Sequence, residues 1–183
     1  PAPAGYINPR DLIQAQIKIA TAQGTRVIRE VVTAVEQTAH GAIVTTESGQ
    51  VYWTRNVLVA AGAFTNVHEL LPEKLPLLIK TETTILAHVA ESEAKRLQEM
   101  PAIVYMVENP ALDSIYLLPP IQYPDGKFYV KMGCNTKYDQ WPTNLQEMRQ
   151  WMISGSSDLA AADMQAALLT ILPDLAVASF KTK

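Results

Sequence analysis

The sequence of 183 residues predicts a mixed α/β (α+β) fold in two parts. Apolar residues recur with a helical period over residues 9–23, and short β-type runs separated by tight turns follow them. After Pro76 the pattern changes to longer β-rich runs, and two helical stretches come after those. We therefore expect a small β-meander within residues 1–75 and an antiparallel-sheet domain with flanking helices over residues 76–183.

The composition indicates a hydrophobic core and excludes several classes of partner. Hydrophobic residues make up 48% of the chain and charged residues 18%, and 15 basic and 18 acidic side chains give a net charge of −3. No basic patch stands out, so nucleic acid is not an expected partner. The single cysteine, Cys134, excludes an internal disulfide and a cysteine zinc cluster, and the three histidines lack the spacing of metal ligands. No apolar run approaches the roughly 18–20 residues of a membrane helix, so no membrane partner is expected.

The first element is predicted to be a helix over residues 9–23. Asn8 is placed to cap it, Pro9 suits the first helical position, and Asp11 is favourable near the positive end of the helix dipole. Gly24 is a suitable residue just after the C-terminal end. The apolar residues that share one face of this helix are Leu12, Ala15, Ile19 and Ala20.

A series of short strands joined by tight turns is predicted to follow the helix. Residues 25–29 read as a strand, and the runs 31–37 and 42–47 flank a short polar loop that indicates a hairpin. A turn around Gly49 leads into residues 51–55, which alternate in the manner of another strand. These runs together predict an antiparallel meander.

The next stretch combines a buried-strand pattern with a small-residue turn. Residues 57–61 are small and branched apolar residues without alternation, which is typical of a strand buried on both faces. Gly62 would allow a sharp turn and a close approach of a ligand to backbone N–H groups. Thr65 or Asn66 would then cap a short helix at 67–71. Strand, turn and helix N-terminus together suit an anion such as a phosphate, although a plain buried strand that ends in glycine has the same pattern.

The second part is predicted to contain an antiparallel sheet and two helices. Residues 91–98 are polar and indicate a loop or a helical turn, and Ser157 is placed to cap the second of the two helices. The predicted strands are 77–90, 102–107, 114–118, 127–132 and the beginning of one at 179–183. The predicted helices are 144–153 and 158–171, the latter with an apolar stripe of Leu159, Ala162, Ala166 and Leu169.

Several short segments follow one another in an order and spacing that is more specific than any one of them. They are Gly5-Tyr6-Ile7-Asn8-Pro9, residues 20–24, 31–35 and 46–49, the run 59–64, Ile115-Tyr116 and Val130-Lys131-Met132-Gly133. In this order the chain resembles the FAD-dependent amine and amino-acid oxidoreductases of the D-amino-acid oxidase type. Within that family it is most similar to the monomeric sarcosine oxidase and N-methyltryptophan oxidase group.

The resemblance implies FAD as cofactor and a small-molecule amine or amino acid as substrate. Enzymes of this kind oxidise a C–N bond by hydride transfer to flavin and pass the electrons to oxygen or another acceptor. The Gly-x-Gly-x-x-Gly turn that holds the FAD pyrophosphate does not occur in the chain, so we expect a fragment that lacks it and the C-terminal flavin segment. Such a fragment is expected to bind FAD weakly and to self-associate through exposed apolar surface.

The resemblance also implies cofactor-binding residues in the first part. Val32 lies on the strand that passes the adenine and offers backbone hydrogen bonds, although a core valine would give the same pattern. Ala61, Gly62 and Ala63 fall where the family's chain runs beside the phosphates and the ribityl chain, and their small size would permit that approach. Cys134 does not match the cysteine that carries the flavin covalently in the sarcosine oxidase group.

Three residues of the second part match positions near the flavin ring or the substrate. Lys131 matches a lysine that promotes the reaction of reduced flavin with oxygen, and it is the predicted catalytic residue; the simpler alternative is an exposed strand lysine. Tyr116 is expected to line the substrate cavity, or else to be an ordinary sheet aromatic, and its neighbour Leu117 stands where that group has a tyrosine. Asn135 falls where the group has a histidine near the substrate, which argues against N-methylglycine itself.

Two other functions remain open on the sequence. A non-catalytic binding or interaction module could keep this architecture without the phosphate-binding turn, since fold does not imply function. A flavin dehydrogenase with an acceptor other than oxygen is the second alternative, and Lys131 argues mildly against it.

Overall fold

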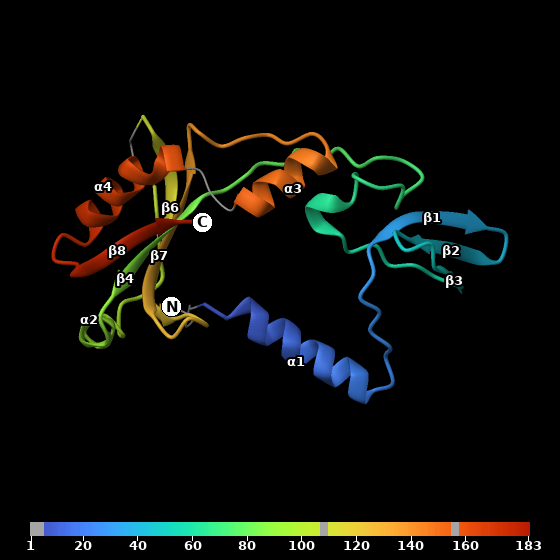
Figure 1. Ribbon diagram of the computed structural model, residues 1–183, viewed down its shortest axis with the longest axis horizontal. Helices are drawn as coiled ribbons and strands as arrows, with labels where there is room; N and C mark the ends of the chain where they lie inside the picture. Colours follow the sequence, from blue (N-terminus) through green and yellow to red (C-terminus); the bar gives the residue numbers. More distant parts are fainter. Residues whose placement is uncertain (1–5, 107–109, 155–157) are drawn as a thin grey trace. The chain divides into compact units, whose positions relative to one another are not determined.

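The computed structural model describes residues 6–106, 110–154 and 158–183, and it confirms the mixed α/β class with two antiparallel sheets and helices. The chain divides into two compact units (Figure 1). We call Ile7–Ile79 the small-sheet unit and Lys80–Lys183 the large-sheet unit. Each contains one sheet, and each is described by itself.

The predicted first helix is confirmed as α1 (Pro9–Ala22). The Asn8 side-chain oxygen accepts a hydrogen bond from the Arg10 N–H at 3.1 Å, and its amide nitrogen donates to Asp11 at 2.7 Å. Gly24 ends the helix with a φ of +94°, a value that favours glycine. No residue of α1 is buried; of the predicted apolar stripe, Leu12, Ala15 and Ile19 are exposed and Ala20 is half-buried.

The predicted meander is confirmed as a three-stranded antiparallel sheet in the order β1-β2-β3. The strands are β1 (Val32–Thr38), β2 (Gly41–Thr46) and β3 (Val51–Thr54). Gly49 makes the second turn with a φ of +82°. Because both turns are tight, neighbours in sequence are also neighbours in the sheet.

Two predicted strands of the small-sheet unit are wrong. Residues 25–29 and 57–61 form no strand, and Leu58 is 92% exposed although the pattern predicted burial on both faces. An apolar extended segment becomes a strand only where a neighbouring strand supplies backbone partners. Within the described residues no strand pairs with either segment.

The predicted helix at 67–71 is also wrong, because the backbone there makes other hydrogen bonds. Glu69 forms an isolated parallel bridge with β1, in which its carbonyl accepts from the Val35 N–H at 2.9 Å. Asn66 does not cap a helix but closes a loop, since its side chain bonds both the N–H and the carbonyl of Leu75. The helical element that the described residues of this region form is the short 3-10 helix η1 (Gly62–Phe64).

The predicted antiparallel sheet of the second part is confirmed, with five strands in the order β5-β6-β7-β4-β8. Its strands are β4 (Thr84–Val89), β5 (Ile103–Tyr105), β6 (Leu112–Gln122), β7 (Phe128–Thr136) and β8 (Val177–Thr182). The polar stretch after β4 forms the short helix α2 (Glu91–Arg96). The turn before β7 is closed by the Gly126 N–H, which donates to the Tyr123 carbonyl at 2.9 Å.

The two predicted helices of this unit are present as α3 (Leu145–Ser154) and α4 (Ala161–Ile171), the latter preceded by the 3-10 turn η2 (Asp158–Ala160). The predicted cap Ser157 lies outside the described residues. The predicted stripe of α4 is wrong: Met164 and Leu168 are buried, whereas Leu159 is 72% exposed. The segment is apolar on almost every side, so its periodicity does not show which side faces the core.

The core of the large-sheet unit lies on one face of the five-stranded sheet. Its strand residues include Ile85, Ala87, Ile115, Leu117, Val130, Met132 and Cys134, and α2 and α4 add Ala94, Met164 and Leu168. Side chains alternate along a strand, so the residues between these point to the opposite side, which we call the second face. Along β7 the second face carries Tyr129, Lys131, Gly133 and Asn135.

Candidate functional site

The three residues predicted to lie near the flavin ring or the substrate share the second face. Lys131 and Asn135 flank Gly133 on β7, and Tyr116 on β6 lies directly opposite Gly133 in the register. The Lys131 ammonium nitrogen lies 5.3 Å from the centre of the Tyr116 ring. Leu117 points the other way and is fully buried in the core. We call Tyr116, Lys131, Gly133 and Asn135 the β6–β7 site.

Lys131 differs from two neighbouring lysines in having no carboxylate partner. Lys80 forms an ion pair with Asp139 at 2.7 Å, and Lys181 lies 3.7 Å from Asp125. Lys131 is half-buried, and within the described residues it makes no ion pair. Its contact with the Tyr116 ring is a cation–π interaction, which orients the ammonium without cancelling its charge.

Tyr116 contributes a neutral phenol to the site. Burial raises the pKa of its hydroxyl to about 12, and the nearby negative charge of Glu82 adds to the effect. The phenol therefore stays protonated at neutral pH, and it can donate a hydrogen bond or form part of a cavity wall. It cannot act as a general base in this state.

The Tyr116 ring occupies the space in which a side chain at position 133 would begin. A Cβ atom added to Gly133 would overlap the ring carbons and the hydroxyl of Tyr116. Because these atoms are the end of a side chain, the ring can move aside at modest cost. We expect Gly133→Ala to lower the free energy of unfolding by about 1 kcal/mol and to displace Tyr116 from Lys131, as measured by urea denaturation and a crystal structure of the variant.

A double-mutant cycle with Tyr116→Ala provides the control for this prediction. In that background the ring is absent, so the added methyl group of Gly133→Ala should have almost no further effect on stability. If Gly133→Ala lowers the free energy of unfolding by the same amount with and without the Tyr116 ring, overlap with that ring is not the cause of the destabilisation.

Asn135 belongs to a polar network that the sequence did not predict. The Lys80 ammonium donates to the Asn135 side-chain oxygen at 2.8 Å as well as to Asp139. Asp139 is fixed in turn by Thr136, whose N–H and hydroxyl donate to its two oxygens at 3.0 and 2.9 Å. Lys80 stands 55 residues before Asn135, so only the register of the folded sheet reveals this contact.

The predicted cofactor-binding residues belong to the small-sheet unit. Val32 begins β1 and pairs with Thr46 on β2, so its backbone lies at the end of the meander. Gly62 has a φ of +54°, and a Cβ atom added there would meet nothing within 4 Å. Gly62 and Ala63 are exposed and Ala61 is half-buried, so space beside this backbone fits the close approach of a large cofactor.

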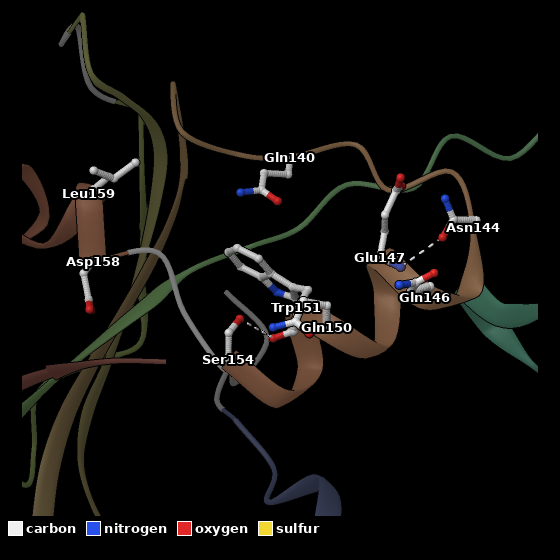
Figure 2. Close-up of a pocket in the computed structure, with 9 residues that line it drawn as sticks. All are labelled: Gln140, Asn144, Gln146, Glu147, Gln150, Trp151, Ser154, Asp158 and Leu159. Atoms are coloured by element: carbon white, nitrogen blue, oxygen red, sulfur yellow. Dashed lines mark hydrogen bonds between the residues drawn. The ribbon is translucent and has the colours of Figure 1, made fainter.

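A hollow beside α3 is a separate feature of the large-sheet unit (Figure 2). Asn144 and Glu147 on its wall serve the start of α3: the Asn144 side chain accepts from the Glu147 N–H at 3.0 Å, and the Glu147 carboxylate accepts from the Thr143 N–H at 2.7 Å. The residues lining the hollow are Gln140, Asn144, Gln146, Glu147, Gln150, Trp151, Ser154, Asp158 and Leu159. None of the predicted site residues is among them.

In the part of the chain that the structure describes, no group of three or more His, Cys, Asp or Glu side chains is placed to hold a metal ion. None of the described helices combines the length and the apolar character needed to cross a membrane.

Comparison with known proteins identifies the family. The model of the FAD dependent oxidoreductase family matches residues 2–178, which is nearly the whole chain. No curated protein matches the chain. The match covers both units, so it includes the meander with its small-residue turn and the sheet with the β6–β7 site. The chain therefore belongs to the FAD-dependent oxidoreductase family, and its cofactor is FAD.

Proposed function

We propose that the protein oxidises the C–N bond of an amino acid or a secondary amine, in the manner of the sarcosine oxidase group. FAD, when bound, supplies the redox chemistry by accepting a hydride from the substrate. This chain's own residues then have to orient the substrate, form the walls of the site and stabilise charge. The family match supports the flavin chemistry, and the β6–β7 site supports a place for the substrate.

The single observation that carries the proposal is the unpaired ammonium of Lys131. A half-buried cation without a carboxylate partner keeps its full electrostatic effect on whatever binds beside it. Oxygen gains negative charge as it takes up electrons, and a fixed positive charge nearby stabilises that change. This favours oxygen over another electron acceptor.

The other residues have supporting roles in the proposal. Tyr116 forms a neutral wall beside Lys131, and Asn135 offers its amide on the same face. In the small-sheet unit the backbone of Val32 would contact the adenine part of FAD. Residues 61–63 would lie beside the phosphates and the ribityl chain, because their small side chains leave the backbone accessible.

An absorbance experiment tests the proposal. The protein, purified at its full natural length, should show the bands of bound flavin. Anaerobic addition of amino acids and secondary amines should bleach the long-wavelength band for at least one substrate, and air should restore it. Absence of flavin, or flavin that none of these compounds reduces, would contradict the proposed function.

A further inference from the structure

The hollow beside α3 has a lining that the proposed function does not use (Figure 2). Its volume of about 670 Å³ lies within the usual range of small-molecule sites, roughly 300–1,000 Å³. Four of its nine lining residues carry a primary amide, and one aromatic ring, that of the half-buried Trp151, forms part of the wall. The hollow therefore offers an apolar surface next to groups that both donate and accept hydrogen bonds.

The amide side chains reach the hollow from two directions. Gln146 and Gln150 are one turn apart on α3, and Trp151 borders the hollow from the same helix. Gln140 comes from the loop after β7, where its N–H donates to the Thr81 hydroxyl at 2.8 Å and its carbonyl accepts from the Thr81 N–H at 2.9 Å. Figure 2 shows the Gln140 side chain pointing toward Trp151. The backbone on both sides is thus held in place before a ligand arrives.

The polar groups of the lining divide into those that the fold uses and those that it leaves accessible. Hydrogen bonds within the protein engage the side chains of Asn144, Glu147, Ser154 and Asp158. Among the described residues, no such bond is made by the three glutamine side chains or by the Trp151 indole N–H. These groups are available to a ligand.

The charge of the lining argues against an anion. None of the described lining residues is Lys, Arg or His, whereas Glu147 and Asp158 are acidic. An organic cation is a weaker match than a neutral ligand, because both carboxylates already accept hydrogen bonds, from Thr143 and Thr182. The groups left accessible are uncharged, so they favour an uncharged ligand that is rich in hydroxyl groups.

We propose that the hollow beside α3 binds a neutral sugar ring. The hydroxyl groups of a sugar donate and accept hydrogen bonds, as the glutamine amides do. One face of the ring carries mainly C–H bonds, and it packs on an indole, whose surface is large and apolar. In this arrangement Trp151 lies under the sugar, and the amides of Gln140, Gln146 and Gln150 bond its hydroxyls. The site is independent of the flavin chemistry, so its test and that of the proposed function can fail separately.

Saturation-transfer NMR on the FAD-loaded protein at its full natural length tests the inference. The probes are glucose, galactose, mannose, N-acetylglucosamine, maltose and cellobiose, and at least one should bind with a dissociation constant in the millimolar range or tighter. Trp151→Ala should raise that constant about tenfold, because the aromatic surface under the ring is lost. The double variant Gln146→Met, Gln150→Met keeps the side-chain length but removes two amides. It should raise the constant at least about fivefold, the effect of one neutral hydrogen bond.

Two variants serve as matched controls for the loss of the indole. Trp151→Phe keeps an aromatic ring and should retain the sugar affinity within about threefold. Trp53→Ala removes an indole that is 62% exposed on β3 and does not line the hollow, so sugar binding should not change. If Trp151→Ala does not fold, the double glutamine variant decides the question, because both of its positions are exposed and tolerate substitution.

Any one of three results would overturn the inference. The first is that no sugar of the panel binds to the wild-type protein. The second is sugar binding that Trp151→Ala or the double glutamine variant leaves unchanged. The third is that 1,4-diaminobutane binds more tightly than any of the sugars and that Trp151→Ala weakens its binding, which would assign the hollow to an organic cation.

Discussion

Replacing Lys131 with methionine is expected to slow the reaction of the reduced enzyme with oxygen about 100-fold, the typical effect of removing one preorganised electrostatic group. Methionine has a similar length but no charge, so the variant removes the ammonium and keeps most of the packing. Reduction of the enzyme by its substrate should change by less than about threefold, because that step does not place negative charge on oxygen. Stopped-flow measurements of the two half-reactions check both numbers.

Lys181→Met is the matched control for this prediction. Lys181 also lies on the second face, and its ammonium lies 4.2 Å from the centre of the Tyr129 ring, but Asp125 already balances its charge. Its replacement should leave the oxygen reaction nearly unchanged. If Lys131→Met slows both half-reactions equally, Lys131 acts on the structure of the site and not on the reduction of oxygen.

The place of Lys131 could be predicted from the sequence because it depends on the period of a strand. Val130 and Met132 alternate with Lys131, and the structure puts the first two in the core and Lys131 on the second face. The turn at Tyr123–Gly126 set where β7 begins, so the side on which each residue lies followed from the alternation. Elements whose geometry is local, such as α1 with its Asn8 cap, were predicted for the same reason.

Contacts between distant parts of the chain could not be predicted in this way. Lys80 reaches Asn135 and Asp139 across 55 and 59 residues, and no spacing or motif links the three. At residues 57–61 a strand was predicted and none formed, because the sequence pattern of a buried strand does not show whether a partner strand is present. The roles proposed for Val32, residues 61–63, Tyr116, Lys131 and Asn135 stay predictions until ligand binding and kinetics are measured.

Glu93 is expected to control how the stability of the large-sheet unit depends on pH. Its carboxylate accepts hydrogen bonds from Arg96 Nε and Nη2 at 2.7 and 2.6 Å, and from the Ala176 N–H at 3.1 Å. The hydrogen bond from Ala176 thus connects Glu93 on α2 to the segment before β8. The hydrogen bond from Arg96 is the main cause that lowers the pKa of Glu93 from 4.5 to about 2, and the one from Ala176 adds to it.

The direction of the pH effect follows from this lowered pKa. Folding favours the ionised form of Glu93. The contribution of this carboxylate to the free energy of unfolding is therefore complete above pH 4.5 and is lost as the pH falls toward 2. Glu93→Gln should lower the free energy of unfolding at pH 7 by about 2 kcal/mol, the value of hydrogen bonds to a charged group. Between pH 4.5 and 2 the variant should lose less stability than the wild type, because its amide does not titrate.

Urea denaturation over a pH series measures both effects. Glu91→Gln is the matched control, since Glu91 lies in the same first turn of α2 but is exposed, and a surface change of this kind alters stability by less than about 0.5 kcal/mol. The decisive quantity is the difference between wild type and Glu93→Gln, which should shrink as the pH falls below 4.5. A difference that stays constant down to pH 2 would mean that the charge of Glu93 does not contribute to the free energy of unfolding. Packing alone would then keep α2 against the segment before β8.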